Sequence, residues 1–238
     1  MLAMRGTHGV HLPGQQDTFG FARIFPETYP NREYFYMNIT RQWSTERIKE
    51  PSSIKADRLL EDIRTERYGI ESRSILFLGH SMGGLLIKQA LINAHNNPRY
   101  TPIKDATRGL VFFATPHHGA DGMLLSLGDV AFKIAESLDI LKTLKSNSIF
   151  SDMMSEHWRH QLEQYCIVSF WGAYDNIVPK KSAVLNLPGD RESIVSLDAD
   201  HSGVCKFGSS QTDLDNFKLV RSNIKELYEM ARKAVRIG

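Results

Sequence analysis

A serine, an aspartate and a histidine in this chain have the residue types and the surroundings that nucleophilic catalysis requires. Ser81 lies within Gly79 to Gly83, and Asp175 and His201 each follow a short apolar run. A serine hydroxyl becomes a good nucleophile when an imidazole takes its proton, and a carboxylate holds that imidazole in one tautomer. We therefore expect Ser81 to attack, His201 to move the proton, and Asp175 to orient His201.

The segment Gly79-His80-Ser81-Met82-Gly83 matches the pattern G-x-S-x-G. The apolar run 75–78 precedes it, and apolar residues at helical spacing follow it over 85–94. Between a strand and a helix, this pattern places the serine on a tight turn with its hydroxyl exposed, and the flanking glycines avoid collisions with the backbone. The pattern alone arises by chance roughly one time in ten in a chain of this length. The predicted strand and helix around it make it specific.

Hydrolysis by such a serine also needs donors for the oxyanion, each contributing roughly 3 to 4 kcal/mol. The backbone N–H of Met82, the residue after the nucleophile, is the first expected donor. An early loop should supply the second, and His8-Gly9-Val10 is the candidate of suitable character, with Val10 as the donor. The residues expected around the substrate are His8, Gly9, His80, Thr115, His117 and His118.

Simpler interpretations exist for several of these residues. Ser81 could be an ordinary serine in a glycine-rich turn, and His201 a surface histidine. His117 and His118 are expected to shape the pocket rather than to act, and His80 to pack or hydrogen-bond beside Ser81. Asp198 and Asp200 compete with Asp175 as the acid, but both lie too close in sequence to His201 to occupy a separate loop.

The elements that must position these residues follow an alternating pattern. Strands are predicted at 34–38, 75–78, 109–114, 166–171 and 193–197, and amphipathic helices at 54–63, 85–94 and 217–231. Alternation predicts a mostly parallel sheet with helices on both faces, which is an α/β fold. Residues that follow the strands of such a sheet converge on one edge. That edge would gather Ser81, the loop 115–119, Asp175 and His201.

Two stretches are harder to interpret. Residues 1–24 are poorly defined and can hold an incomplete first strand. Residues 122–163 are helical in pattern and rich in leucine and methionine, which predicts an insertion between strands. Leucine and methionine at helical spacing more often belong to the hydrophobic core than to a lipid pocket. Because this stretch lies between two predicted strands above the carboxyl edge of the sheet, a lid or a wall for an acyl chain is an equally good interpretation.

Composition limits the class of protein. The 238 residues fit a single domain over 1–238, and 29 basic against 27 acidic residues give no field that would attract nucleic acid. Cys166 and Cys205 form neither a zinc motif nor a disulfide framework, which predicts a reducing, cytoplasmic location. An acyl-enzyme on Ser81 would need neither a metal nor an organic cofactor, so we expect none. No apolar run reaches membrane-spanning length and no signal peptide is predicted, while peripheral membrane contact stays open.

The order Ser, Asp, His is that of the α/β hydrolases, and several segments extend this similarity. These segments are Gly79 to Leu85 with Lys88-Gln89-Ala90, Phe112 to Ala120, Ser182-Ala183, Asp200-His201, and Cys205-Lys206-Phe207. Together they resemble the lipase-like domains of the family of unknown function 676, the serine-active-site-containing proteins and the GPI inositol-deacylases. The closest likeness is to the hydrolase domains at the N-termini of fungal NACHT-type signalling proteins. It covers roughly residues 25 to 225.

The resemblance implies ester hydrolysis, of lipids in particular, and a place within a larger signalling protein. Its relatives also associate with mitochondria or the endoplasmic reticulum. Two departures stand out: the weakly apolar 1–7 replaces a clear strand before His8-Gly9, and Gly172 and Ala173 stand where relatives often carry a carboxylate. We therefore expect a serine esterase or lipase-like enzyme. The alternative is a hydrolase-fold interaction module with little turnover.

Overall fold

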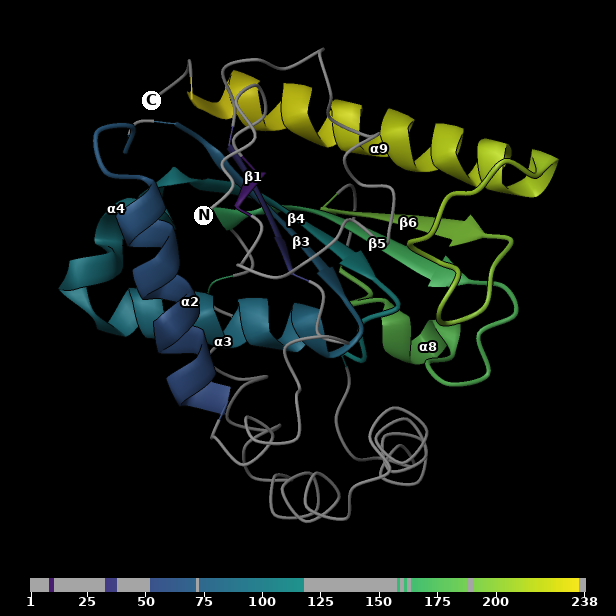
Figure 1. Cartoon of the computed structure of the whole chain (residues 1–238), viewed down its shortest axis with the longest axis horizontal. Helices are drawn as coiled ribbons and strands as arrows, with labels where there is room; N and C mark the ends of the chain where they lie inside the picture. Colours follow the sequence, from purple (N-terminus) through teal and green to yellow (C-terminus); the bar gives the residue numbers. More distant parts are fainter. Residues whose placement is uncertain are drawn as a thin grey trace.

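The computed structural model of the chain describes residues 9–10, 33–37, 52–71, 73–117, 158, 161, 164–187 and 191–235. Its centre is a parallel sheet whose strands lie side by side in chain order (Figure 1). The strands are β1 (Gly9–Val10), β2 (Glu33–Met37), β3 (Ile75–His80), β4 (Thr107–Phe113), β5 (Cys166–Gly172) and β6 (Glu192–Leu197). The predicted parallel sheet is confirmed.

Helices cover both faces of this sheet, as predicted. They are α2 (Ser52–Glu66), α3 (Met82–Asn96), the short η2 (Pro98–Tyr100), α4 (Thr101–Ala106), α8 (Lys180–Ala183) and α9 (Gln211–Val235). When consecutive parallel strands are also neighbours in the sheet, crossover connections of the same handedness all lie on the same face of the sheet. Accordingly α2 and α3 share a face, and α9, which follows the last strand, lies along the other (Figure 1).

The predicted insertion over 122–163 lies outside the described residues, apart from Trp158 and Gln161, which are both helical. His8 and His118 also lie outside them. The prediction missed η2 and α4. Both begin with a proline in the first turn, where its missing N–H costs little, and both are too short to show a helical period.

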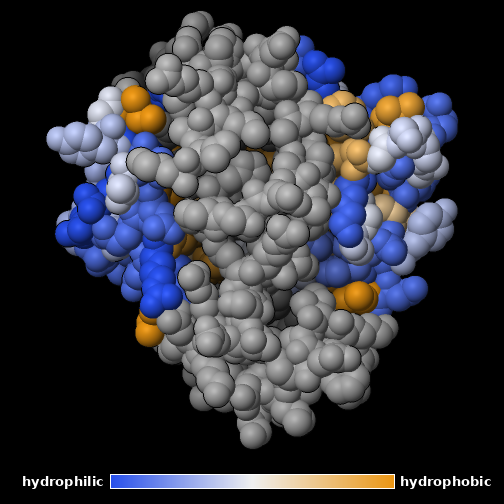
Figure 2. All heavy atoms as spheres, viewed as in Figure 1, coloured by the Kyte–Doolittle hydropathy of each residue, from blue (hydrophilic) through white to orange (hydrophobic). Residues whose placement is uncertain are grey.

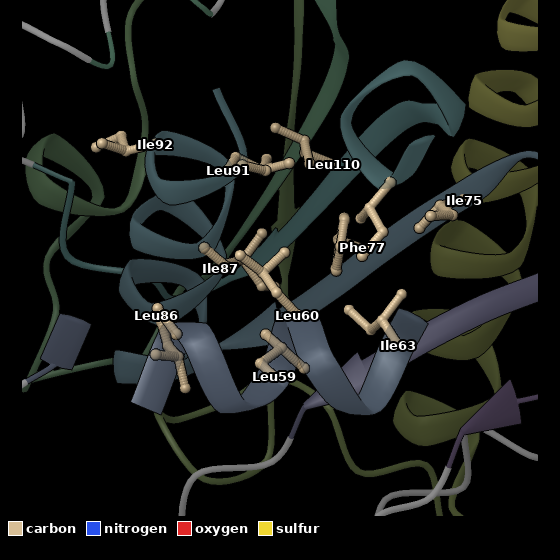
Figure 3. Packing of buried hydrophobic residues seen from close by; sticks show 14 of the residues in the cluster. Leu59, Leu60, Ile63, Ile75, Phe77, Leu86, Ile87, Leu91, Ile92 and Leu110 are labelled. Atoms are coloured by element: carbon tan, nitrogen blue, oxygen red, sulfur yellow. The ribbon is translucent and has the colours of Figure 1, made fainter. Parts of the chain in front are cut away.

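The larger core lies between the sheet and the α2–α3 layer. Leu59, Leu60 and Ile63 of α2 point toward α3 and toward Phe77 of β3 (Figure 3). Each buried aliphatic side chain contributes roughly 1.5 to 3 kcal/mol. Ile54, which the periodicity assigned to this stripe, is instead 44% exposed.

The opposite face of the sheet packs against α9. Its core joins Val220, Ile224 and Leu227 of α9 to side chains from β3, β4 and β5, such as Leu78 and Val111. Neighbouring strand residues point to opposite faces, so each of these strands is apolar on both sides. This is why β3, β4 and β5 read as continuous apolar runs. The part of the surface coloured in Figure 2 is mostly hydrophilic, with isolated hydrophobic residues.

Candidate active site

The turn between β3 and α3 holds Ser81 in an unusual conformation. Its φ is 53° and its ψ is −126°, a region that residues other than glycine rarely adopt. Two backbone hydrogen bonds hold the turn: Ser81 N–H donates to Phe113 O at 2.9 Å, and Gly84 N–H donates to Ser81 O at 3.1 Å. Such conformations persist where the surrounding structure enforces them, and they cluster at functional sites.

Two glycines make this turn sterically possible. A Cβ at Gly79 would lie 2.7 Å from the backbone nitrogen of Gly84, and a Cβ at Gly84 would lie 2.8 Å from Cβ of Thr115. Neither contact is tolerable, so strand and helix approach closely only with glycine at both positions. Gly84 lies one residue beyond the G-x-S-x-G pattern, and the pattern did not indicate its role.

The structure brings Ser81, His201 and Asp175 together. His201 Nε2 lies 3.0 Å from Ser81 Oγ, and His201 Nδ1 lies 2.9 Å from Asp175 Oδ2. All three residues are buried. They come from the turn after β3, the loop after β5 and the loop after β6, which meet at one edge of the sheet.

The carboxyl group of Asp175 is held in its ionised form. Burial by itself raises its pKa, but hydrogen bonds from His201 and from the backbone of Val178 and Ile177 outweigh burial, so the pKa lies below its usual value. Those two backbone N–H groups each donate to Oδ1 at 2.8 Å. An ionised carboxylate only accepts, so Nδ1 of His201 carries the proton and the Nε2 lone pair faces Ser81.

The competing aspartates have other partners. Asp200 Oδ1 accepts a hydrogen bond from Gly203 N–H at 2.6 Å. The main chain of Asp198 pairs with the Asn216 side chain, which accepts from its N–H and donates to its carbonyl, both at 3.1 Å. Both contacts shape the loop that carries His201.

Asn216 is a functional candidate that the sequence interpretation missed. It is buried and fastens the His201 loop to α9. A signal was present, because Asn216 extends the apolar stripe of Val220 and Ile224 by one helical turn. A polar residue on a buried face needs partners, and its partners here are main-chain groups of the loop.

The structure does not bring Val10 to Ser81. Strand β2 lies between β1 and β3, and Val10 is in register with Phe35, which is in register with Phe77, four residues before Ser81. Two strand spacings amount to about 10 Å and four residues to about 13 Å. For Val10 to serve as an oxyanion donor, the segment His8-Gly9-Val10 would have to lie beside the end of β3. In the structure the neighbour of β3 is β2, and β1 lies on the far side of β2. The Met82 N–H, in contrast, lies in the first turn of α3, where backbone N–H groups lack helical acceptors.

Two other expected pocket residues, Thr115 and His117, support the loops around the site. Thr115 is fully buried against Gly84. His117 is buried, its N–H donates to Ser182 O at 2.8 Å, and its ring meets the Phe112 ring edge-on at 4.7 Å. The loop after β4 is thereby tied to α8. Gly9 lies on β1, away from Ser81.

His80 points toward the His201 loop. Its Nε2 lies 2.8 Å from the backbone oxygen of His201. Burial, and next the charge on the His201 ring, lower the pKa of His80 to about 4. The ring is therefore neutral at physiological pH.

Within the described ranges, no group of three or more His, Cys, Asp or Glu side chains is arranged to hold a metal ion. Of the helices that the structure describes, none is both long and apolar enough to cross a membrane.

No family model matches this chain. Sequence comparison finds Protein SERAC1 of Bos taurus, 27% identical over 164 residues, and of Homo sapiens, 25% identical over the same length. In both cases the match covers 65% of this chain and 24% of the relative, so the chain spans about a quarter of the length of these curated relatives.

Comparison with solved structures finds human thioesterase 2, at a TM-score of 0.41 and 16% identity, covering 73% of this chain and 82% of that one. It also finds a monoacylglycerol lipase of Paleococcus ferrophilus, at a TM-score of 0.39 and 12% identity, covering 70% and 74%. Likeness at this level assigns no activity. The parallel sheet, the strained serine turn and the order of Ser81, Asp175 and His201 give the chain an α/β-hydrolase fold.

Proposed function

We propose that this chain is a serine hydrolase that cleaves carboxylic esters. The observation that carries the proposal is the hydrogen-bonded series from Ser81 Oγ through both ring nitrogens of His201 to Asp175. The imidazole can take the serine proton from one side while the carboxylate stabilises the resulting charge from the other.

The reaction would proceed in two halves. Ser81 Oγ attacks the ester carbonyl carbon as His201 Nε2 takes the hydroxyl proton, and the oxyanion accepts a hydrogen bond from Met82 N–H. The intermediate collapses, the alcohol leaves with the proton from His201, and an acyl group stays on Ser81. Water then attacks, His201 takes its proton, and the carboxylic acid leaves as the proton returns to Ser81.

The substrate class follows from the family resemblance, which favours lipid esters. The chain would act as the hydrolase part of a longer protein, since its curated relatives are about four times the matched length. A cytoplasmic location stays a prediction, which rests on the cysteine content of the sequence.

A second candidate is a hydrolase-fold interaction module with little turnover. The position of Val10 favours it, because among the residues that the structure describes only the Met82 N–H is identified as an oxyanion donor. Loss of one donor costs roughly 10²- to 10³-fold in kcat.

Labelling with a fluorophosphonate probe tests the proposal. We expect the wild-type chain to be labelled at Ser81 and to hydrolyse p-nitrophenyl esters, with acyl-chain length varied to test lipid preference. Ser81→Ala should lose the label. His201→Ala should abolish acylation with melting near wild type, and a folded wild-type sample that takes no label would favour the interaction module.

A further inference from the structure

His80 connects the two sequence-distant parts of the site. It is the last residue of β3 and directly precedes Ser81, yet its ring contacts His201, 121 residues further on. The side chain is 5% exposed, and its ring centroid lies 5.0 Å from that of His201. The residue next to the nucleophile thus holds the main chain of the base.

The chemistry of this contact is fixed by its partners. A backbone carbonyl only accepts hydrogen bonds, so the Nε2 of a neutral His80 must carry the hydrogen. Because the ring is buried, it stays neutral at physiological pH and presents one N–H to His201 O.

The main-chain hydrogen bonds of Asp198 and Ala199, in the same loop, lead elsewhere. Asn216 fastens Asp198 to α9, and Tyr174 N–H donates to Ala199 O at 3.1 Å, which links the loop to the end of β5. In the sheet, β4 and β5 separate β6 from β3. The His80 contact crosses that distance and sets the loop against the strand that carries Ser81.

We propose that His80 is a positioning residue for the base. Its Nε2–H holds the main chain of His201 at a fixed distance from Ser81, so that the His201 ring keeps its 3.0 Å contact with Ser81 Oγ. The inference rests on the proposed hydrolase function. A misplacement of about 1 Å costs on the order of 10²-fold in rate, so this hydrogen bond should affect kcat.

A matched pair of variants tests the hydrogen bond separately from packing. His80→Gln keeps an N–H donor near the position of Nε2, and His80→Met has similar length without a donor. His95→Gln, at the far end of α3, is the control. The readouts are kcat and KM with p-nitrophenyl acetate, the rate of fluorophosphonate labelling, the melting temperature, and amide hydrogen exchange over 198–204.

We expect His80→Met to lower kcat about 10- to 100-fold with a smaller change in KM, and to speed exchange in the loop. His80→Gln should recover most of both, and His95→Gln should match wild type. The inference would be overturned if His80→Gln and His80→Met had the same kcat and the same amide exchange over 198–204. This holds even if both variants lose activity to the same extent. If wild type takes no label, the proposed function fails, and the exchange of the two variants still decides whether His80 holds the loop.

Discussion

The two sides of Ser81 are built differently. Toward β4, β5 and β6, Asp175 and His201 are buried, and hydrogen bonds join them and their loops to neighbouring side chains and main chain. Toward β1 and β2, a two-residue strand ends at the level of Phe77, well before the end of β3. Under the proposed function, proton transfer is therefore assembled at the ends of β3, β5 and β6, whereas oxyanion binding depends on the first turn of α3.

The largest effect should follow from damage to the proton-transfer side. Asp175→Asn replaces an acceptor with an amide whose N–H₂ can face Nδ1, which favours the wrong tautomer of His201. We expect kcat for p-nitrophenyl acetate to fall about 10⁴-fold. Asp200→Asn, next to His201 but bonded to Gly203, should leave kcat near wild type. A loss below 10-fold for Asp175→Asn would show that another group is the acid.

Acid should lower the free energy of unfolding through His80, which contacts the His201 loop. The pKa of His80 is about 4 in the folded chain and 6.5 as its ordinary value, with burial the main cause. Between these values the unfolded chain binds the proton and the folded chain does not, so the free energy of unfolding falls as pH falls from 6.5 toward 4. The slope is at most about 1.4 kcal/mol per pH unit. Urea unfolding across this range should show a shallower dependence in His80→Gln, and an unchanged slope would argue against a buried neutral His80.

The serine turn, shared by both sides, should respond to a single methyl group. Gly84→Ala places Cβ 2.8 Å from Cβ of Thr115, and we expect about 1 to 3 kcal/mol loss in the free energy of unfolding. Adding Thr115→Ala to Gly84→Ala removes Oγ1 and Cγ2, the atoms that clash with the new methyl group, and should restore part of the lost free energy of unfolding. Denaturant unfolding of the four proteins of this cycle gives the coupling, and strict additivity would contradict the packing explanation.

The smallest effect is expected on the other side. Val10→Pro deletes the backbone N–H that the sequence suggested as an oxyanion donor, and Val10→Ala keeps it. From the position of β1 we expect the two variants to differ less than about 10-fold in kcat, measured well below their melting temperatures. A difference of 10²- to 10³-fold would place Val10 at the oxyanion and erase the contrast between the two sides.

Much of the arrangement was readable from local patterns. The strands that end at Ser81, Asp175 and His201 are apolar runs followed by polar residues, and in a parallel sheet such endings meet at one edge. The order of the strands in the sheet could not be predicted in this way, because it depends on which strand edges pair in the folded chain. The residues of 9–10 and 33–37 do not indicate which of the two strands lies next to β3.

Lys88 shows a second limit of pattern reading. A lysine on a helix is normally assigned to solvent, yet Lys88 is 3% exposed, with Nζ 6.0 Å from the centroid of the Phe112 ring and 5.6 Å from that of Trp158. Burial lowers its pKa to about 7, and the charge of Glu192 opposes this. Its aromatic neighbours come from distant parts of the chain, so spacing along α3 carried no sign of them.

The strict succession of strands has a consequence for the growing chain. Each new strand pairs with the one made just before it, so the sheet can extend in the direction of synthesis. Ser81 and His201 are 120 residues apart, which at ribosomal speed is roughly 6 to 24 s. During that interval the serine turn can exist without the histidine proposed as its base, and under the proposed function the nascent chain would be chemically silent until β6 has joined the sheet.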